Sequence, residues 1–550
     1  MKQLSEEIIK MIENYDVVTF DVFDTLVKRN TQSFRDVYKL MDRKYNDITG
    51  KRIPKWFYRE RVHAPKVAYK RNGKQEANLN EIYDVLHVEN KEIIKHLECE
   101  VELEYVTRNP VIYDVYQYCC ASNKRIYAIS DMYLPQEVVK KILGKCGYKF
   151  DKIFVSCEYR ASKANGKLYS YFMDEMNIKP EQFVHIGDNY NSDVLSAQSK
   201  GIKAIKIDGD DFYLRYTKQR KAFCTVDERI LNKFISNRLK DIDNPVEKIG
   251  YEILGPLLYY YTLWLEERIS ENRIIDAYFC ARDGYLLKKA YEVLHTNKNK
   301  CKLHYFYVSK RSVSAAYNRL GNQRENLKIY MKQENMEEKA GLVDIGWSGR
   351  MHKMLNEICE NKIYGFYFGT FSAFKKNVHD GISGGWLNIS RYKMAKVYMN
   401  AAFIEILFLD TYSGTTSSYK REENVVFPVK TSQNPNGKII RAMQDGALKF
   451  IKEWHDAAYT DIDVKSNSLI NSLLNFCIYP FYEDVNLISD ELYGVGEKYC
   501  KLVNVDMNIN RLQGLKKACW KGGYLTKVCR YNFIGRVYEI FNPIILMFKI

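Results

Sequence analysis

The chain has 550 residues, a length that predicts three or four domains and excludes a single small module. Hydrophobic residues make up 46% and charged residues 28%, which is typical of globular proteins and excludes global disorder. Lys and Arg number 84 against 68 for Asp and Glu, giving a net charge of +16. This excess favours anionic partners such as phosphorylated substrates, nucleic acid or an anionic membrane face.

Targeting and cysteine signals indicate a cytoplasmic protein. The residues after Met1 lack the apolar core and cleavage site of a secretory signal. The longest apolar run, Ile253–Leu265, contains a proline and is shorter than the roughly 18 residues of a membrane span. The 13 Cys include no CxxC pair, and their number is odd, so neither a zinc site nor a disulfide framework is indicated.

The first part of the chain alternates strands and helices, which predicts a parallel sheet in an α/β domain. A helix is expected over residues 5–14, and the first strand follows at Asp16–Phe20. A long, charged, helical stretch then runs to about residue 120, and we expect it to form a lid over the carboxyl edge of the sheet. The later strands are expected at residues 125–129, 152–155, 182–186 and 203–207.

A second alternating region follows two polar stretches, residues 215–221 and 241–245, which mark a domain boundary. From about residue 400 the pattern becomes mostly helical and aromatic. The second region is expected to hold strands at residues 274–280, 303–308, 341–344 and 363–368 and helices at 285–295 and 350–359. We therefore expect domains over residues 1–215, 245–410 and 411–550, with the helical insert at about 30–120.

Polar side chains follow the strands of the first region, where ligands of open α/β sheets bind. They are Asp21 after the first strand, Ser130 after the second, Lys163 past the third, and Asp188 with Asp193 after the fourth. A nucleophilic carboxylate, a hydroxyl, an ammonium and metal-binding acids are what phosphoryl transfer through an aspartyl-phosphate requires.

Four motifs occur in order in this region: VVTFDVFDTL, YAISD, SKANGKLY and HIGDNYNSD. With them, residues 15–210 resemble the haloacid dehalogenase-like hydrolase superfamily. The resemblance implies a Rossmann-like α/β domain with a helical cap at residues 30–120, a bound Mg²⁺ and a phosphorylated substrate. It also implies roles for single residues: Asp21 as nucleophile, Ser130 and Lys163 (in preference to Lys167) on the phosphoryl group, and Asp21, the backbone carbonyl of Phe23, Asp188 and Asp193 on the metal.

One position departs from the pattern of the family phosphatases, which carry an acid two residues after the nucleophile. Phe23 occupies that position here, and Asp24 follows it. On an extended segment, a shift of one residue turns the side chain to the opposite face. Loss of a general acid costs about 10²–10⁴-fold in rate. The dehalogenase branch also has an aromatic residue there, but it lacks a metal-binding acid such as Asp188.

Three interpretations of this domain therefore stay open. In the first interpretation, the domain is a metal-dependent phosphatase or phosphotransferase in which Asp24 or water replaces the acid. In the second, it binds a phosphorylated ligand without turnover. In the third, it is an enzyme of another, carbon-centred reaction.

The second region contains two strand-to-helix joints, DAYFCARDG at 276–284 and GLVDIGWSGR at 341–350. Small residues at such joints let backbone N–H groups point at an anion. The candidates for a second anion site are Arg282, Asp283, Asp344, Ser348 and Arg350. In the alternative, Arg282 and Asp344 form a structural ion pair that ties the two loops together. Lys310 and Arg311 either add charge to the same cleft or are solvated.

Two further resemblances concern this region. The loop around GWSG is similar to the phosphate-binding loop of type I phosphoribosyltransferases, although Asp344 stands alone where that loop has two acids. The combination of SDMYLP, ARDGYLL and DIGWSG resembles large two-part bacterial members of the hydrolase superfamily, which are encoded with glycosyltransferases in surface-polysaccharide clusters. This resemblance implies a sugar phosphate or glycan precursor as substrate. The alternative is a non-hydrolytic binding or scaffold protein of such a system.

The last 40 residues, 511–550, hold eight basic residues and one acid, Glu539, with aromatic residues between them. Such a segment can lie on an anionic membrane, so a peripheral position at the inner face of the membrane is one hypothesis. In the alternative, a helix packs on the preceding domain with its basic face in solvent. No nucleic-acid-binding motif is present, so a nucleic-acid partner is not expected.

Overall fold

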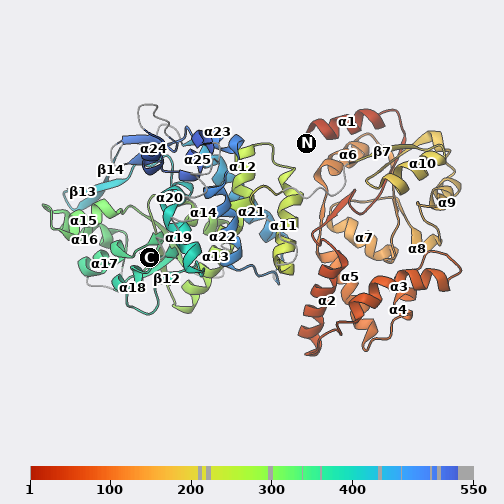
Figure 1. Ribbon diagram of the computed structural model, residues 1–550, viewed down its shortest axis with the longest axis horizontal. Helices are drawn as coiled ribbons and strands as arrows, with labels where there is room; N and C mark the ends of the chain where they lie inside the picture. The colour runs from red at the N-terminus through yellow and green to blue at the C-terminus, as the bar shows by residue number, and fades with distance from the viewer. Residues whose placement is uncertain are drawn as a thin grey trace. The chain divides into compact units, whose positions relative to one another are not determined.

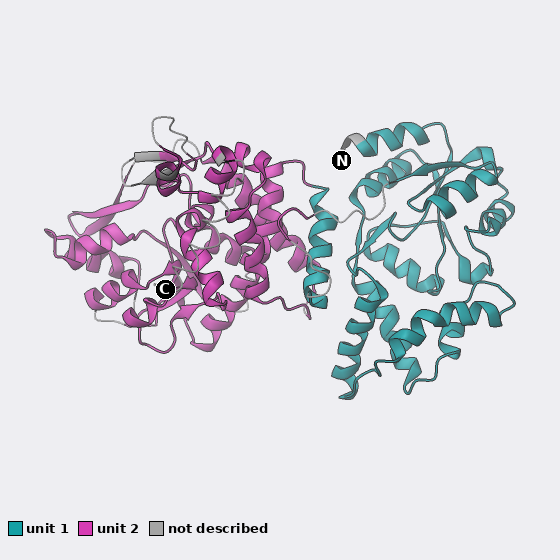
Figure 2. Ribbon diagram, in the orientation of Figure 1, with its two compact units in different colours: residues 1–213, 220–241 teal, residues 214–219, 242–550 magenta. Residues whose placement is uncertain are grey.

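The structure, a computed structural model, describes residues 2–207, 214–217, 224–294, 301–336, 339–359, 362–431, 437–459, 461–495, 498–503 and 510–529. The chain forms two compact units (Figure 2). Unit 1 comprises residues 1–213 and 220–241, and unit 2 comprises residues 214–219 and 242–550. Each unit is built on its own five-stranded sheet, as the alternating pattern predicts. The domain limits predicted at residues 215, 245 and 410 stay predictions.

The sheet of unit 1 is parallel throughout, with the strand order β5-β4-β1-β6-β7. Its central strand is an apolar run buried on both faces, as expected of a parallel sheet covered by helices. All five predicted strands are confirmed: β1 (Val17–Phe20), β4 (Arg125–Ser130), β5 (Lys152–Val155), β6 (Phe183–Gly187) and β7 (Lys203–Lys206).

Helices cover this sheet (Figure 1). One hydrophobic cluster joins α9 (Lys167–Met176) and α10 (Ser196–Ser199) to it. Val17, Tyr127 and Phe154 of three neighbouring strands pack with Leu168 and Phe172 of α9. The helices around the sheet are α1 (Lys2–Ile12), α6 (Pro110–Ala121), α7 (Gln136–Lys145), α8 (Ser156–Tyr159), α9 (Lys167–Met176) and α10 (Ser196–Ser199), with the short η1 (Pro180–Gln182) and η2 (Tyr190–Leu195).

The insert between β1 and β4 is helical, as predicted. It leaves and rejoins the sheet through an antiparallel pair, β2 (Val27–Arg29) and β3 (Val106–Arg108). Arg61 lies inside the insert with its Nε 2.9 Å from Oε2 of Glu98, and both side chains are almost fully buried. The helices of the insert are α2 (Phe34–Thr49), α3 (Phe57–Arg71), α4 (Leu79–Asp84) and α5 (Lys91–Glu104).

Helix α11 (Val226–Leu239) also belongs to unit 1. Its Arg229 Nε donates to Oδ1 of Asp36 in α2 at 2.7 Å, and Asp36 is 1% exposed. Asn237 Nδ2 donates to Oδ1 of Asn30 at 2.9 Å. A buried carboxylate is stable only when it is paired and hydrogen-bonded, so α11 is an integral part of this unit.

The sheet of unit 2 is also parallel, with the order β12-β11-β10-β8-β9. The chain passes from β8 outward to β9, returns to β10, and continues in the other direction to β11 and β12. The strands are β8 (Asp276–Cys280), β9 (Lys302–Phe306), β10 (Gly341–Trp347), β11 (Tyr364–Thr370) and β12 (Gly384–Gly385). The four strands predicted here are confirmed, and β12 is an addition.

The helices of unit 2 pack on this sheet or on one another. On one face Leu355 of α17 packs with Val313 and Leu327 from the two helices that precede it. These elements are α12 (Pro245–Ile249), η3 (Gly250–Leu254), α13 (Gly255–Glu271), α14 (Tyr285–Leu294), α15 (Lys310–Tyr317), α16 (Gln323–Gln333), α17 (Arg350–Cys359), α18 (Phe374–Asn377), α19 (Arg391–Met399), α20 (Ala401–Phe408), α21 (Lys438–Asp456), α22 (Ser466–Ile478) and α23 (Tyr482–Ile488).

The C-terminal region is mostly helical, as predicted, and it also contains two hairpins, β13 (Thr416–Glu422) with β14 (Val425–Lys430) and β15 (Leu492–Val495) with β16 (Lys498–Lys501). The segment proposed to touch a membrane begins with α24 (Arg511–Lys517) and α25 (Lys521–Cys529). Trp520 is fully buried, and its ring stacks on Phe403 at 4.6 Å. Residues 530–550, which hold most of that segment, lie outside the described residues. Among the helices that the structure describes, none is long and apolar enough to cross a membrane.

Candidate active site

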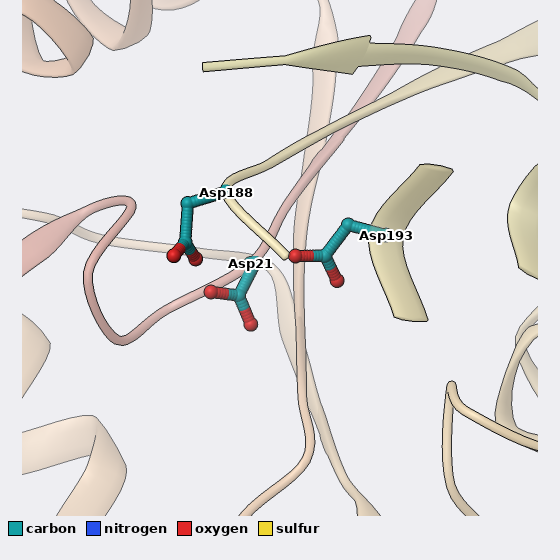
Figure 3. A group of neighbouring side chains, drawn as sticks. All are labelled: Asp21, Asp188 and Asp193. Carbon is teal, nitrogen blue, oxygen red and sulfur yellow. The ribbon is translucent and has the colours of Figure 1, made fainter. Parts of the chain in front are cut away.

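Three carboxylates meet at the carboxyl edge of the first sheet. Asp21 follows β1, Asp188 follows β6, and Asp193 lies in the first turn of η2. Each offers an oxygen atom that lies within 4.8 Å of the others (Figure 3). The backbone N–H of Asp21 donates to the carbonyl of Ile186 at 2.9 Å, which fixes the end of β1 against β6. The structure thus brings together the three acids that the motifs single out.

Lys163 lies between two of these acids. Its Nζ is 2.5 Å from Oδ1 of Asp21 and 2.6 Å from Oδ1 of Asp193, and its side chain is 2% exposed. The alternative in the same motif, Lys167, is exposed on the first turn of α9. The geometry therefore supports the preference for Lys163.

The acids outnumber the one buried ammonium, and their pKa values reflect this. Burial raises the pKa of Asp21 to about 7; Lys163 opposes the rise, and the neighbouring carboxylates add to it. Burial also raises the pKa of Asp188, with repulsion from Asp24 and Asp193. Burial works against the charge of Lys163, but its two carboxylate partners hold its pKa well above the ordinary value. A cluster of this kind favours the binding of a further cation.

Ser130, with its hydroxyl, is the fifth predicted residue of the site, after the three acids and Lys163. Ser130 ends β4 and is 1% exposed, and its Oγ has no hydrogen-bond partner among the described residues. An unsatisfied buried hydroxyl costs about 1–3 kcal/mol, and such groups in native proteins call for an explanation. An oxygen atom of a bound ligand would satisfy this one.

Phe23 and Asp24 occupy the position where the general acid was expected. Phe23 is 8% exposed, and the guanidinium of Arg29 lies 4.0 Å from the centre of its ring. Asp24 has a left-handed backbone with φ of 61°, so the segment is not extended there, and the alternation assumed from the sequence does not hold. Its carboxylate is 34% exposed and lies 3.8 Å from Nη1 of Arg29. Asp24 is therefore not buried in the core.

Two residues that the motif analysis did not single out support the site. Asp131 accepts the backbone N–H of Lys163 at 2.7 Å, which positions the loop that carries the ammonium. His185 is fully buried in β6, with Nδ1 2.9 Å from Oγ1 of Thr19 and Nε2 3.5 Å from Asp193. Burial lowers the pKa of His185. Asp131 directly follows Ser130 at the end of a predicted strand, so the sequence pattern could have indicated it as a residue of the site. No spacing rule indicates His185.

A second cleft lies at the carboxyl edge of the other sheet, in unit 2. It has a volume of about 310 Å³, and all five residues predicted for a second anion site line it: Arg282, Asp283, Asp344, Ser348 and Arg350. Arg282 and Asp344 are both described, and no ion pair joins them, so the alternative of a structural ion pair is wrong. Lys310 and Arg311 line the same cleft.

Solved structures that are similar to this chain cover somewhat more than a third of it. No curated protein matches the chain. Similar solved structures include a protein described as a predicted phosphoglycolate phosphatase from Haemophilus somnus (16% identity, 35% of this chain and 85% of that one, TM-score 0.24). A magnesium complex of a haloacid dehalogenase family enzyme from Bacteroides thetaiotaomicron is 12% identical over 36% of this chain and 96% of that one, with a TM-score of 0.26. The L-2-haloacid dehalogenase from Xanthobacter autotrophicus is 13% identical over 38% and 80%, also with 0.26.

Structural likeness at these scores does not indicate an activity. The family comparison agrees with the order of the four motifs and with the parallel sheet that carries them. Residues 15–201, about a third of the chain, match the family of haloacid dehalogenase-like hydrolases.

Proposed function

We propose that unit 1 is a metal-dependent phosphatase or phosphotransferase that works through an aspartyl-phosphate on Asp21. The observation that carries the proposal is the position of Lys163, which lies within 2.6 Å of two buried carboxylates, while the neighbouring strand β4 ends in Ser130, whose hydroxyl is unpaired. An ammonium and a hydroxyl at this edge suit the oxygens of a phosphoryl group.

Oδ1 of Asp21 is paired with Lys163, and Oδ2 has no partner among the described residues. Oδ2 of Asp21 would attack phosphorus, and the bond from phosphorus to the leaving oxygen would break as that oxygen takes a proton. Water would then attack the same phosphorus and break its bond to Asp21. This step releases phosphate and restores the carboxylate.

The residues present fit a magnesium ion. Mg²⁺ prefers one or two carboxylates together with phosphate oxygens, and the cluster offers carboxylate oxygens within 4.8 Å of one another. Asp21, Asp188, Asp193 and the backbone carbonyl of Phe23 would hold the ion. When bound, it would neutralise charge on the phosphoryl group.

For the substrate we propose a small phosphorylated compound, a sugar phosphate or glycan precursor of surface-polysaccharide biosynthesis. The net charge of +16 favours an anionic ligand. The narrower assignment to a sugar rests on the resemblance of the SDMYLP, ARDGYLL and DIGWSG motifs to two-part bacterial proteins.

The test is phosphate release from a panel of sugar phosphates and an activated aryl phosphate, measured with Mg²⁺ and with EDTA. We expect release that requires Mg²⁺ and that EDTA lowers by at least about 10²-fold, because EDTA removes the ion that would neutralise charge on the phosphoryl group. Release that is equal under both conditions would exclude a metal-dependent reaction.

Asp24 is expected to supply the proton for poor leaving groups, because its carboxylate is partly exposed and lies close enough to Asp188 to affect its pKa. Asp24→Asn should lower the turnover of an alkyl phosphate by about 10²-fold and leave an activated aryl phosphate within about threefold. The measurement is the ratio of the two kcat values. An equal loss on both substrates would show that Asp24 acts on the structure of the site instead.

A second candidate function is non-hydrolytic binding of a phosphorylated ligand, with a scaffold role in polysaccharide assembly. The observation that favours it is Phe23, whose ring is covered by Arg29 where the family phosphatases carry an acid. If this candidate is right, a sugar phosphate binds to unit 1 and no substrate of the panel releases phosphate.

A further inference from the structure

The cleft of unit 2 lies where the strand order of its sheet reverses. Residues 280–283, at the end of β8 and just after it, line it. So do Gly346, Ser348, Gly349 and Arg350, which run from the end of β10 to the start of α17. The chain leaves β8 toward β9 and leaves β10 in the opposite direction, so the two loops diverge. Ligands of open parallel sheets bind in this crevice, at the carboxyl ends of the strands. A volume of about 310 Å³ is at the lower end of the range for small-ligand pockets.

Four cationic residues line the cleft, and Arg282, Lys310 and Arg350 are three of them; the fourth is Arg311. Arg282 is half-buried, and Lys310 and Arg350 are exposed. The side chains of Arg282, Lys310 and Arg350 form no hydrogen bond or ion pair within the described part of the chain. Arg282 lies close enough to Asp283, and Lys310 to Glu405, to counter part of the rise that burial causes in the pKa of each acid. Arg350 is the first residue of α17, where the backbone N–H groups of the first turn have no partner within the helix. The cationic side chains and the free N–H groups of the first turn of α17 together favour an anionic group, such as a phosphate, beside them in the cleft.

Acids line the cleft more deeply. Asp344 is 6% exposed; its Oδ1 accepts the N–H of Ile345 at 2.8 Å, and its Oδ2 has no partner within the described part of the chain. Glu405 accepts the indole N–H of Trp347 at 2.8 Å. Burial raises the pKa of Asp344, and repulsion from Asp283 adds to the rise. Burial also raises the pKa of Glu405 to about 7. Next to these acids, a ligand group that forms hydrogen bonds is therefore favoured over an anionic ligand group.

The spacing of these acids does not suit a metal ion. Among the described residues, the group close enough to hold one is that of Asp21, Asp188 and Asp193 in unit 1. Hydroxyl groups are the better partners for carboxyl oxygens that lie apart, because each hydroxyl can donate to a different acid.

Glycines keep the backbone of both loops in place. Gly346 has φ of 128°, and a Cβ there would lie 2.0 Å from the carbonyl oxygen of Gly369. A Cβ at Gly284 would lie 2.8 Å from backbone atoms of Cys280. Of the residues in these contacts, Cys280 and Gly346 line the cleft.

We propose that the cleft of unit 2 is a second ligand site, which binds a compound with a phosphate at one end and several hydroxyl groups at the other. Arg282, Lys310, Arg350 and the first turn of α17 hold the phosphate. Asp283, Asp344 and Glu405 accept hydrogen bonds from the hydroxyls. The site uses no residue of unit 1, so it does not depend on the function proposed for that unit.

Isothermal titration of the full chain tests this site. The chain carries Asp21→Asn, to stop turnover in unit 1, and the buffer contains EDTA. The probes are glucose 1-phosphate, inorganic phosphate and glucose. We expect the sugar phosphate to bind at least about tenfold more tightly than either fragment, since it alone reaches both sides of the cleft. Absence of sugar phosphate binding would overturn the proposal.

Variants assign the binding to the cleft. Arg350→Ala and Arg282→Ala should each weaken glucose 1-phosphate by about tenfold or more, because each removes a charged donor to the phosphate. Lys353→Ala, an exposed position one turn further along α17, is the matched control and should leave the affinity unchanged. Asp344→Asn should weaken the sugar phosphate and leave inorganic phosphate unaffected. Equal affinities in the Arg variants and the control would show that the ligand binds elsewhere.

The proposed reaction in unit 1 and the proposed ligand site in unit 2 can be tested independently of each other. Arg350→Ala in an otherwise unaltered chain should keep its Mg²⁺-dependent phosphate release. Loss of that release together with loss of binding would contradict a separate site.

Discussion

Replacing Asp21 with Asn is expected to lower phosphate release by at least about 10³-fold, because an amide oxygen cannot replace the carboxylate as nucleophile. The variant should still fold. Burial already raises the pKa of Asp21 to about 7, and the substitution removes a carboxylate that neighbours two others. The measurement is steady-state phosphate release with Mg²⁺, together with acid quenching to detect a phosphoryl group on the intact chain.

Asp114→Asn is the matched control. Asp114 is exposed on α6, so the change removes the same charge from unit 1 without touching the site. The control should release phosphate at the rate of the unaltered chain. Activity of Asp21→Asn within tenfold of the control would exclude Asp21 as the nucleophile, and so would a phosphoryl adduct that persists in the variant.

Lys163→Met is expected to destabilise unit 1 by about 3–5 kcal/mol, the usual cost of removing one partner from a buried ion pair. The side chains of Lys163 and Asp193 are 2% and 1% exposed, so the carboxylates left behind cannot turn to water. The measurement is hydrogen exchange of the amides in β1 and β6 in the full chain, which reports the free energy of opening this sheet. EDTA in the buffer prevents a divalent cation from replacing the ammonium.

Lys152→Met serves as the control for that variant. Lys152 pairs with Glu175, and the two side chains are 36% and 39% exposed, so the change should cost about 0–1 kcal/mol. Adding Asp21→Asn to Lys163→Met should restore part of the lost stability, because one of the stranded charges is removed. If Lys163→Met costs no more than the control, Lys163 is not the counter-charge of these acids.

Much of both sheets could be predicted from the sequence because parallel strands covered on both faces are continuous apolar runs. Val17–Phe20 and residues 277–280 are buried runs of this kind. The strand β12 has two glycines and carries no apolar signal. The strand β13 reads TSSYKRE, which is too polar to be separated from a loop, and it packs through the single buried ring of Tyr419.

The residues of the candidate site could be predicted because each follows a strand, and parallel strands end at one edge. The direction of Asp24 could not be predicted in the same way, because it depends on one backbone angle. Asp is one of the residues enriched at positive φ, and that enrichment is the sequence signal for the left-handed turn at Asp24. The contacts of His185 join β6 to β1 and η2, and they exist only in the folded chain.

The position of α11 in the chain has a consequence for dividing this protein into fragments. Residues 214–219 are counted with unit 2, where the carboxylate of Glu252 accepts the backbone N–H groups of Arg215 and Tyr216. The chain then returns to unit 1 for α11. A proteolytic cut or a gene truncation near residue 215 would therefore separate Arg229 from the buried Asp36. A fragment that ends at Asp241 keeps this pair, so an N-terminal fragment with the whole of unit 1 is longer than the four sequence motifs suggest.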